Sequence, residues 1–347
     1  MDLSLRSPLG LLTLTSIQGI GGTTAEKLAN RFATFGEILD AVDTDFKGVA
    51  NRTVVAKLRD PGMLRPAMDS AGMIADRADR AGVRMISIYD ESYPVRLFDC
   101  EPRPPIVYAR GRLPSTKAIA CTGSRDPTDY GVASASRITA LLAEAGWTLV
   151  SGLTRGVDSI AMEAALAAGT PAVAVLGTGI DTYSSDRARK LADSVVDAGG
   201  CVITEQPFGF EGDQGSMIRR NRLATGLSVA SCMLQFALDN EGMPTHAVRY
   251  SLLQGRPIFT PVTPPQYACE ETTGNEALTD MTGLQLASAI DVKDSIREIL
   301  ERDFAEVSVA MALSGRDDYP ALLAWLDEVH AEVEERLSMQ DYTPAFA

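Results

Sequence analysis

Short apolar runs alternate with amphipathic helical stretches through the middle of the chain, from about residue 84 to residue 262. The runs are ISIY, PIVYA, AIACTG, TLVSG, AVAVLG, CVITE, VASCMLQF and PIFTPV, separated by stretches such as YGVASASRITALLAEAGW and SDRARKLADSVVDAGG. Runs of this length with helices between them are typical of parallel strands joined by right-handed crossovers. The pattern predicts an α/β fold built on a doubly wound, mostly parallel sheet.

The first 82 residues show a helical pattern instead. In LTSIQGIGGTTAEKLANRFATFGEILDAV a glycine-rich turn precedes a helix that Thr23 or Thr24 is expected to cap, and Leu28, Phe32 and Phe35 recur at helical spacing. Such a turn points backbone N–H groups outward at a helix start, where a phosphate can bind. The pattern resembles a helix-hairpin-helix element, which in many proteins holds a DNA backbone. A tight turn between two packed helices is the alternative.

Acidic side chains are concentrated in the C-terminal quarter. The net charge is −14, but residues 1–116 carry 15 basic and 14 acidic side chains, residues 117–262 carry 12 and 14, and residues 263–347 carry 5 and 18. The near-neutral body does not exclude a polyanionic ligand. The charge and the helical pattern predict three domains: a small helical domain (1–82), an α/β domain (83–289) and an acidic helical C-terminal module (290–347).

The composition also limits the cellular setting. No run approaches the roughly 18 apolar residues that a membrane span needs, and MDLSLRSPLG lacks the basic start and long apolar stretch of a signal peptide. We therefore expect a cytoplasmic protein without a membrane partner. The five cysteines form no CxxC pair and only two histidines accompany them, which favours buried free thiols over a metal site or disulfides.

Glycine-rich loops follow several predicted strands, at the carboxyl ends where doubly wound sheets bind ligands. They contain Gly123–Ser124–Arg125, Ser151–Gly152 with Gly156, and Gly177 with Gly179. Glycine lets a phosphate approach the backbone, and the helix that follows supplies N–H donors. The loops therefore predict an anion site.

That anion is expected to be a chain of phosphates. Neither CTGSRD nor SGLTRGVD fits GxGxxG with an acidic residue about 20 positions later, and no GxxxxGK[ST] string is present. Arginines accompany the glycines instead: Arg125, Arg155, Arg219, Arg220 and Arg222. A guanidinium binds phosphate oxygens in pairs, so several spaced arginines suit extended nucleic acid better than one nucleotide.

The ordered blocks YPVRL, PPIVYARG, CTGSRDPTDYG, VSGLTRGVDSIAMEAAL, TPAVAVLGTGIDTYSS, ITEQPFG, MIRRNRLATGLS and GRPIFTPV, over residues 93–262, resemble the DprA/Smf family of DNA-processing proteins. The resemblance implies an extended Rossmann-like domain that binds single-stranded DNA, forms a homodimer and delivers the DNA to a RecA-type recombinase during uptake or recombination. It implies no cofactor and no catalytic activity. The block LLQGRPIFTPV is expected either to supply part of the dimer face or to be an internal strand.

The chain departs from the family pattern at several positions. Met162 stands where the family usually has His, Tyr183–Ser184 where it has Tyr-Pro and then Asn, and NEGMPTH where it has Ser-Gly-Ser or Ser-Gly-Thr. The family's frequent basic winged-helix tail has no recognisable counterpart in the acidic residues 290–347. We therefore expect a divergent member whose C-terminal module tempers DNA binding, so that deleting it raises affinity and leaves a folded body.

The candidate DNA-binding residues come from the loops and from the RNR block. Arg125 is expected to bind a phosphate over the cleft, with an ion pair to Asp126 or Asp158 as the alternative. Arg220 and Arg222 are expected to position the strand backbone. The full set is Gly123, Ser124, Arg125, Ser151, Gly152, Arg155, Gly156, Gly177, Gly179, Arg219, Arg220, Asn221 and Arg222.

Two further pairs of residues carry alternatives. Phe208 and Phe210 flank Gly209 in a polar loop, where they either stack on bases, as in sequence-tolerant single-strand binders, or pack against the protein. Asp158 and Asp181 each follow a glycine loop, and helix capping is favoured there over a role as general acid.

Two other function classes remain open. One is a nucleotide-binding sensor or phosphoribohydrolase, in which the glycine loops hold one nucleotide monophosphate. The chain lacks the Pro-Gly-Gly-x-Gly-Thr-x-x-Glu sequence of those hydrolases, so an enzyme is the weaker hypothesis. The other is a protein-interaction module that acts through the acidic C-terminus.

Overall fold

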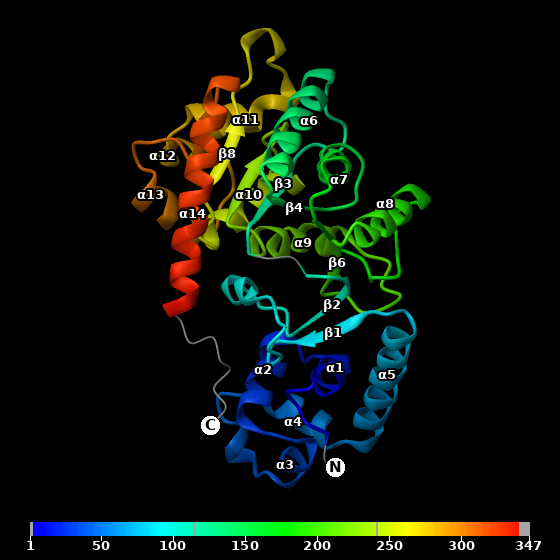
Figure 1. The fold of residues 1–347 in the computed structure, drawn as a ribbon. Helices are drawn as coiled ribbons and strands as arrows, with labels where there is room; N and C mark the ends of the chain where they lie inside the picture. The colour runs from blue at the N-terminus through cyan, green and yellow to red at the C-terminus, as the bar shows by residue number, and fades with distance from the viewer. Residues whose placement is uncertain (1–2, 114–115, 241, 340–347) are drawn as a thin grey trace.

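The computed structural model describes residues 3–113, 116–240 and 242–339, and it consists of a small helical domain attached to a large α/β domain (Figure 1). The N-terminal helices are α1 (Pro8–Ser16), α2 (Gly22–Arg31), α3 (Phe35–Asp40), η1 (Asp43–Phe46), α4 (Arg52–Arg59) and α5 (Pro61–Arg80). Side-chain caps begin several of them: the Asp60 carboxylate accepts from the Gly62 N–H, and Pro61 takes the first helical position, where no N–H is needed.

The glycine turn before α2 differs from the expectation. The helix begins at Gly22 with Gly21 as its cap, so Thr23 and Thr24 lie within the first turn and do not cap it. Gly21 supplies no side-chain acceptor. The close approach of Gly22 to Pro105, whose Cδ lies 2.9 Å from the position a Cβ would take, explains why this turn packs on the α/β domain.

Within the described residues, nine strands form one sheet in the order β1-β2-β6-β5-β4-β3-β7-β8-β9. The strands are β1 (Arg84–Ser87), β2 (Ile106–Gly111), β3 (Ala118–Thr122), β4 (Thr148–Ser151), β5 (Ala172–Val175), β6 (Cys201–Thr204), β7 (Ala230–Met233), β8 (Ile258–Pro261) and β9 (Ala310–Leu313). The seven strands from β6 to β9 in this order are parallel, while β1 and β2 form an antiparallel pair that joins β6 antiparallel. The predicted doubly wound, mostly parallel sheet is confirmed.

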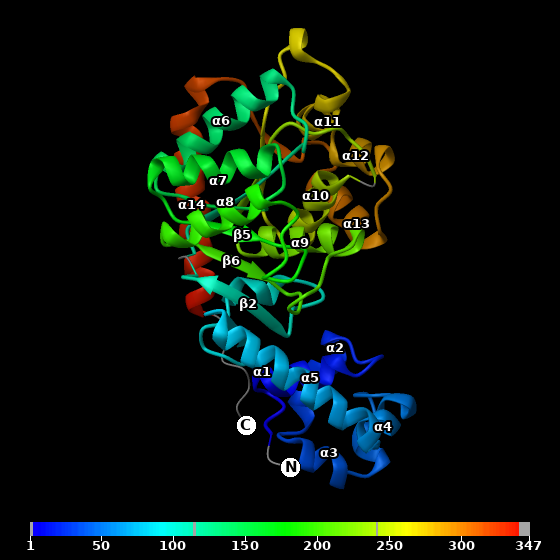
Figure 2. The same ribbon diagram turned by 90° about the vertical axis from the view of Figure 1, so that its right-hand side faces the viewer.

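Helices cover both faces of this sheet (Figures 1 and 2). The crossovers are α6 (Asp129–Glu144), α7 (Val157–Ala168), α8 (Asp186–Asp197), α9 (Gln214–Gly226) and α10 (Met243–Leu253). Helices α7 and α9 both contact β3, β4 and β5, so they lie on opposite faces; α6 and α8 pack beside α7, and α10 beside α9. All four residues of β4, β5, β6, β7 and β8 are buried, as expected for strands covered on both sides.

The C-terminal part includes a strand as well as helices. It comprises η3 (Pro265–Tyr267), η4 (Glu270–Thr272), α11 (Thr273–Asp280), α12 (Gly283–Ala289), α13 (Asp294–Asp303), β9, η5 (Arg316–Asp318) and α14 (Tyr319–Met339). Residues 307–313 were expected to be helical, but they alternate with a period of two, which fits a strand. β9 pairs with β8 over four residues.

Helix α14 packs on the body of the sheet domain. Leu322 and Leu326 are buried in the main core, and the Trp325 ring lies edge-on to Phe259 with centroids 6.2 Å apart. Figures 1 and 2 show α14 running along the α/β domain toward the helical domain. Residues 290–339 are therefore built into the sheet and its covering layer.

One hydrophobic core extends from the helical domain into the sheet, and a second, smaller core lies among α10 to α13. Four of the five cysteines are buried as free thiols and Cys269 is half-buried, as expected from their spacing. Within the described ranges, no helix combines the length and the apolar content that crossing a membrane requires.

Candidate nucleic-acid interface

The loops after β3, β4, β5 and β7 meet at the carboxyl edge of the sheet. β3 pairs with β4 on one side and with β7 on the other, so β3 lies at the point where the winding direction reverses. Doubly wound sheets bind ligands in the crevice outside this point. The loop after β3 contains Gly123, Ser124 and Arg125, and it therefore occupies the position where binding is expected.

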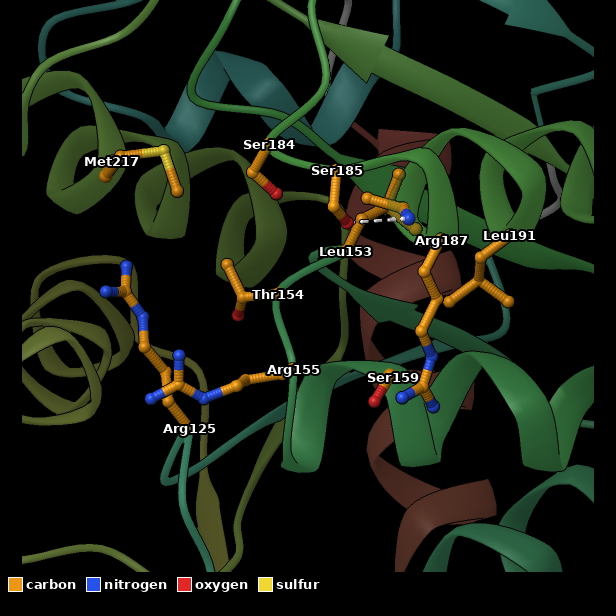
Figure 3. Close-up of a pocket in the computed structure, with 11 residues that line it drawn as sticks. Arg125, Leu153, Thr154, Arg155, Ser159, Ser184, Ser185, Arg187, Leu191 and Met217 are labelled. Carbon is orange, nitrogen blue, oxygen red and sulfur yellow. Dashed lines mark hydrogen bonds between the residues drawn. The ribbon is translucent and has the colours of Figure 1, made fainter.

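Two pockets adjoin at this edge because both are lined by Arg125 and Met217. The first has a volume of about 340 Å³ and lies between the loops after β3, β4 and β5. Figure 3 shows Arg125 and Arg155 on one side of it and Arg187 on the other, with Ser184 and Thr154 between. The second, of about 590 Å³, extends from Arg125 to the loop after β7. We call the two pockets together the Arg125 trough.

Arg125 is exposed and forms no ion pair with another described residue, although its charge helps to lower the pKa of the neighbouring Asp126 carboxyl. Its Nη2 lies 3.5 Å from the thioether sulfur of Met243, a weak acceptor. Neither Asp126 nor Asp158, the alternatives considered from the sequence, takes this guanidinium. Both pair with other arginines. Arg125 thus presents unsatisfied donors where the two pockets meet.

The other arginines of the first pocket are held by carboxylates at the surface. Arg155 binds Asp126 through two parallel hydrogen bonds, Nε to Oδ1 at 2.8 Å and Nη2 to Oδ2 at 2.6 Å. These bonds lower the pKa of the exposed Asp126 carboxyl and raise that of Arg155. Arg187 pairs with Glu163 at 2.9 Å. Exposed pairs of this kind are weak and exchange readily with other ions.

Arg220, which was expected to position the DNA backbone, is buried and paired within the protein. Only 4% of its side chain is exposed; its Nη2 donates to Asp158 Oδ2 at 2.6 Å and its Nη1 to the Val175 carbonyl at 3.1 Å. A Cβ at Gly152 would lie 1.6 Å from Arg220 Nη1. The glycine break after β4 therefore makes room for the protein's own guanidinium, and the space expected to hold a phosphate is filled.

The carboxylate of Asp158 has three donors. Ser151 Oγ donates to Oδ1 at 3.1 Å, while Thr154 Oγ1 and Arg220 donate to Oδ2. Ser151 is buried and also donates to the Cys121 carbonyl at 2.6 Å. Asp158 thus fixes the loop after β4 and the middle of α9 in relation to each other, and neither it nor Ser151 faces the trough.

The remaining RNR residues separate into buried and exposed positions. Arg222 is buried and paired with Glu205, and Asn221 Nδ2 donates to the Met243 carbonyl at 2.9 Å. Both side chains therefore hold α9 in place, and their expected contact with DNA stays a prediction. Arg219 is exposed on the same helix and forms no ion pair within the part of the chain described.

The glycine loops are packed against protein atoms. Gly156 has a φ of +83°, and a Cβ there would lie 2.3 Å from the Ser124 carbonyl oxygen. The Val157 N–H at the start of α7 donates to that same oxygen, so this helix start is already engaged. The other glycines also have close neighbours, which for Gly123, Gly177 and Gly179 include Val157, Met217 and Pro207. The Ser124 hydroxyl accepts from the Asp126 N–H at 3.0 Å.

Phe208 is also a packing residue. It is buried edge-on against Tyr108, with ring centroids 5.9 Å apart, and the Arg77 guanidinium lies 5.4 Å from its centroid. Phe210 is half-buried and lies in the same loop. Asp181 forms an ion pair with Arg77 of α5 and accepts from the Gly209 N–H at 2.8 Å. It does not cap a helix; it joins this loop to the helical domain.

Several residues of the trough were missed in the sequence. Met217 lines both pockets, and Ser184, Ser185 and Arg187 line the first. In α9, Ser216 and the residues from Arg220 onward are buried, whereas Met217 is half-buried near the start of the helix. Arg187 lies in the first turn of α8, next to the Ser185 cap. No motif marked it.

The trough is suited to binding an anion with an apolar part. Its charged lining residues are Arg125, Arg155 and Arg187, with one carboxylate, Asp239, in the second pocket. Met217, Met243, Ile218 and Phe236 supply apolar surface to the second pocket. Neither histidine lines the trough. In the described residues no three His, Cys, Asp or Glu side chains are grouped as a metal site requires.

Comparison with known proteins gives consistent results. Residues 84–299 match the family described as DNA recombination-mediator protein A. Protein Smf of Escherichia coli K12 is 30% identical over 250 residues, which are 72% of this chain and 64% of that protein. The chain spans less than two thirds of the length of the first curated relatives it matches.

Two solved structures have the same fold. DNA processing protein A of Streptococcus pneumoniae matches with a TM-score of 0.64 and 19% identity over 92% of this chain and 98% of that one. DNA processing protein A of Helicobacter pylori, a structure reported for its single-stranded DNA binding mode, matches with a TM-score of 0.50 and 22% identity over 64% of this chain and 97% of that one.

Proposed function

The chain belongs to the DNA recombination-mediator protein A family, also called DprA/Smf, and from this membership we propose that it binds single-stranded DNA in the Arg125 trough. The observation that carries the proposal is Arg125, which forms no ion pair with any described residue and lies at the sheet's switch point, between two pockets that differ in character. The first is bordered by two more arginines, and the second offers apolar surface beside Phe236 and Met243. A flexible strand can place a phosphate at Arg125 and a base in the second pocket.

The proposed action is binding without catalysis. We propose that the bound strand is protected and passed to a RecA-type recombinase in DNA uptake or recombination. We also propose that the protein acts in the cytoplasm, as a homodimer and without a cofactor. Within the block LLQGRPIFTPV, residues 258–261 form β8, which lies between β7 and β9 inside the sheet. This part of the block supports the internal-strand alternative over the dimer face. The family description as a recombination mediator supports the recombinase as partner.

A single-nucleotide ligand is disfavoured by the loop after β4. In a nucleotide sensor or phosphoribohydrolase this loop would hold the phosphate, but here Arg220 and Asp158 occupy the space over Gly152. A mononucleotide would have to displace a buried ion pair, which is costly.

Equilibrium binding to labelled oligonucleotides tests the proposal. We expect the protein to bind oligo-dT more tightly than duplex of the same length, to ignore a panel of mononucleotides, and to lose affinity steeply as salt rises, because phosphate binding releases counterions. Equal affinity for duplex would contradict the strand preference, and tight mononucleotide binding would favour the sensor. Adding RecA to the bound strand tests the transfer step separately.

A further inference from the structure

Two tyrosines from distant parts of the chain stack at the same edge of the sheet. The rings of Tyr130, in the first turn of α6, and Tyr267, in the loop after β8, are 11° from parallel with centroids 4.5 Å apart. Tyr267 is 47% exposed. Figure 1 shows this loop standing beyond the sheet next to the first turn of α6. Neither ring belongs to a hydrophobic core.

Backbone contacts hold both rings in place. The Tyr130 hydroxyl donates to the Val262 carbonyl at 3.2 Å. The Tyr267 N–H donates to the Pro264 carbonyl at 2.8 Å, and Pro264 and Pro265 stiffen the turn that carries it. A preformed stack with one ring half open to solvent resembles the aromatic surfaces on which unpaired bases stack, since the outer ring accepts one more flat ring.

The pair is within reach of the Arg125 trough. The loops after β3, β7 and β8 leave neighbouring parallel strands at the same edge, and β8 lies two strands from β3, or about 10 Å at the spacing of strands in a sheet. Arg125 and Tyr130 are also five residues apart in one segment. A strand that leaves the second pocket along the sheet edge would meet Tyr267 next.

The charges around the pair favour a base over a phosphate. Asp129, Glu270 and Glu271 are exposed in the segments that carry the two rings, and negative charge repels the DNA backbone. Arg137, farther along α6, is bound through Nε to the Tyr319 hydroxyl at 2.7 Å. The surface around the two rings therefore favours contact with an uncharged base over contact with a phosphate.

We propose that Tyr267, backed by Tyr130, stacks on a nucleobase of single-stranded DNA that lies beyond the phosphate bound at Arg125. The inference rests on the proposed function. It assigns the contact to the face of a base, so Tyr267 adds affinity without adding to the number of phosphates bound. If the two rings serve only to fix the loop after β8, removing one leaves DNA affinity unchanged.

The test compares Tyr267→Ala and Tyr267→Phe with wild-type protein, binding labelled dT oligonucleotides at several salt concentrations. Leu284→Ala is the control, since Leu284 is also 47% exposed and lies on α12. We expect Tyr267→Ala to weaken binding roughly five- to a hundredfold, the range for loss of one base stacked on an aromatic ring, by the same factor at every salt concentration. Tyr267→Phe and Leu284→Ala should bind as wild type does.

A second measurement distinguishes loss of stacking from a change in the conformation of the loop after β8. In Tyr267→Trp the indole fluorescence should be quenched by dT oligonucleotides, and not by an oligonucleotide that is abasic at the stacked position. Unchanged affinity in Tyr267→Ala, or an unquenched indole in a protein that binds DNA, would overturn the inference while Arg125 binding stands. If wild-type protein does not bind dT at all, the proposed function fails and this inference fails with it.

Discussion

Arg125 stands apart from the other arginines at the sheet edge because of what surrounds it. Arg220 and Arg222 are buried against Asp158 and Glu205, and Arg155 is held by Asp126. Among the described residues, the hydrogen-bond partner of Arg125 is the thioether of Met243. A phosphate that binds this guanidinium therefore displaces no strong partner. We expect Arg125 to be the first residue that binds the charged part of a ligand.

Replacing Arg125 should reduce DNA affinity, whereas replacing Arg220 should reduce the stability of the fold. Arg125→Ala is expected to weaken binding of oligo-dT by about 1–3 kcal/mol, the size of a charge-assisted hydrogen bond, with an unchanged melting temperature. Arg220→Ala is expected to cost about 3–5 kcal/mol of unfolding free energy, because Asp158 is left charged and buried. Urea denaturation and binding titrations of both variants would separate the roles. A stable Arg220→Ala protein with lost DNA affinity would restore the role expected from the sequence.

Under the proposed function, Asp126 competes with DNA for Arg155. Asp126→Asn removes the two charge-assisted hydrogen bonds and leaves Arg155 free beside Arg125, so we expect several-fold tighter binding and a salt dependence steeper by about one released counterion. Asp303→Asn is the matched control, since Asp303 binds Arg302 through the same two-bond geometry at 2.7 Å and does not line the trough. A gain in both variants would point to net charge alone.

The reactivity of the cysteine thiols tests whether they are buried as the structure shows. Burial raises the pKa of Cys100 and Cys201 to about 12 and raises that of Cys232. Their thiols therefore stay protonated at pH 8, and only the thiolate reacts quickly. We expect iodoacetamide to label Cys269 first in the native protein, as judged by mass spectrometry of peptides. Rapid labelling of Cys201 would show that β6 opens to solvent.

At the scale of residues, the sequence identified Arg125 but not which of its neighbours are buried. The block MIRRNRLATGLS contains three arginines whose charge suggests DNA, and the partners Asp158 and Glu205 that neutralise two of them lie 62 and 17 residues away in the chain. Such pairings follow from the packing of α9 across the sheet. Likewise Gly152 indicated a close approach correctly, but the approaching group is a guanidinium of the protein.

At the scale of elements, β9 and α14 decide how the C-terminal part behaves. β9 covers the edge of β8 over four residues, and α14 buries Leu322 and Leu326 and places Trp325 edge-on to Phe259. Arg336, near the end of this helix, also reaches Asp99 at 3.4 Å. The helical pattern of the last 60 residues was recognisable in the sequence. The four-residue strand β9 was not predicted, because its few alternating residues were included in a segment interpreted as helical throughout.

Deleting residues 290–347 should therefore damage the fold. Without β9 and α14, the edge of β8 and the rings of Phe259 and Trp147 become exposed, and an uncovered sheet edge promotes aggregation. We expect the truncated chain to melt at lower temperature or to aggregate, measured by thermal denaturation and light scattering. A truncated chain that is monodisperse, melts cooperatively and binds DNA more tightly would instead support a separable, tempering module.

At the scale of the whole molecule, the helical domain and the sheet share one core. The buried cluster includes Leu11, Phe35, Ile86 and Tyr108, from both parts. Tyr89 donates to Asn30 Oδ1 at 2.7 Å, and Arg103 lies 3.4 Å from Glu26 across the same boundary. The alternation of strands and helices predicted the sheet because each run was apolar on both faces. The contact between the helical domain and the sheet has no comparable pattern in the sequence, so it was not predicted.

This shared core predicts joint unfolding. We expect the helical domain and β1–β2 to unfold with the rest of the sheet in one transition, so that calorimetric and van't Hoff enthalpies agree. Two resolved transitions, the first removing only helical signal, would show that the boundary near residue 82 separates units of independent stability. A Tyr89→Phe variant, which loses the bond to Asn30, should then shift only the first.

The position of β3 in the sheet has a consequence during synthesis of the chain on the ribosome. Cys121 of β3 lies beside Cys232 of β7, about 110 residues later in the chain, and translation adds roughly 5–20 residues per second. β3 therefore leaves the ribosome about 5–20 s before one of its two partners exists. During that interval the edge of β3 that pairs with β7 has no partner in the nascent chain. We expect a chaperone, or late collapse of the chain, to keep this apolar edge from aggregating until β7 is synthesised.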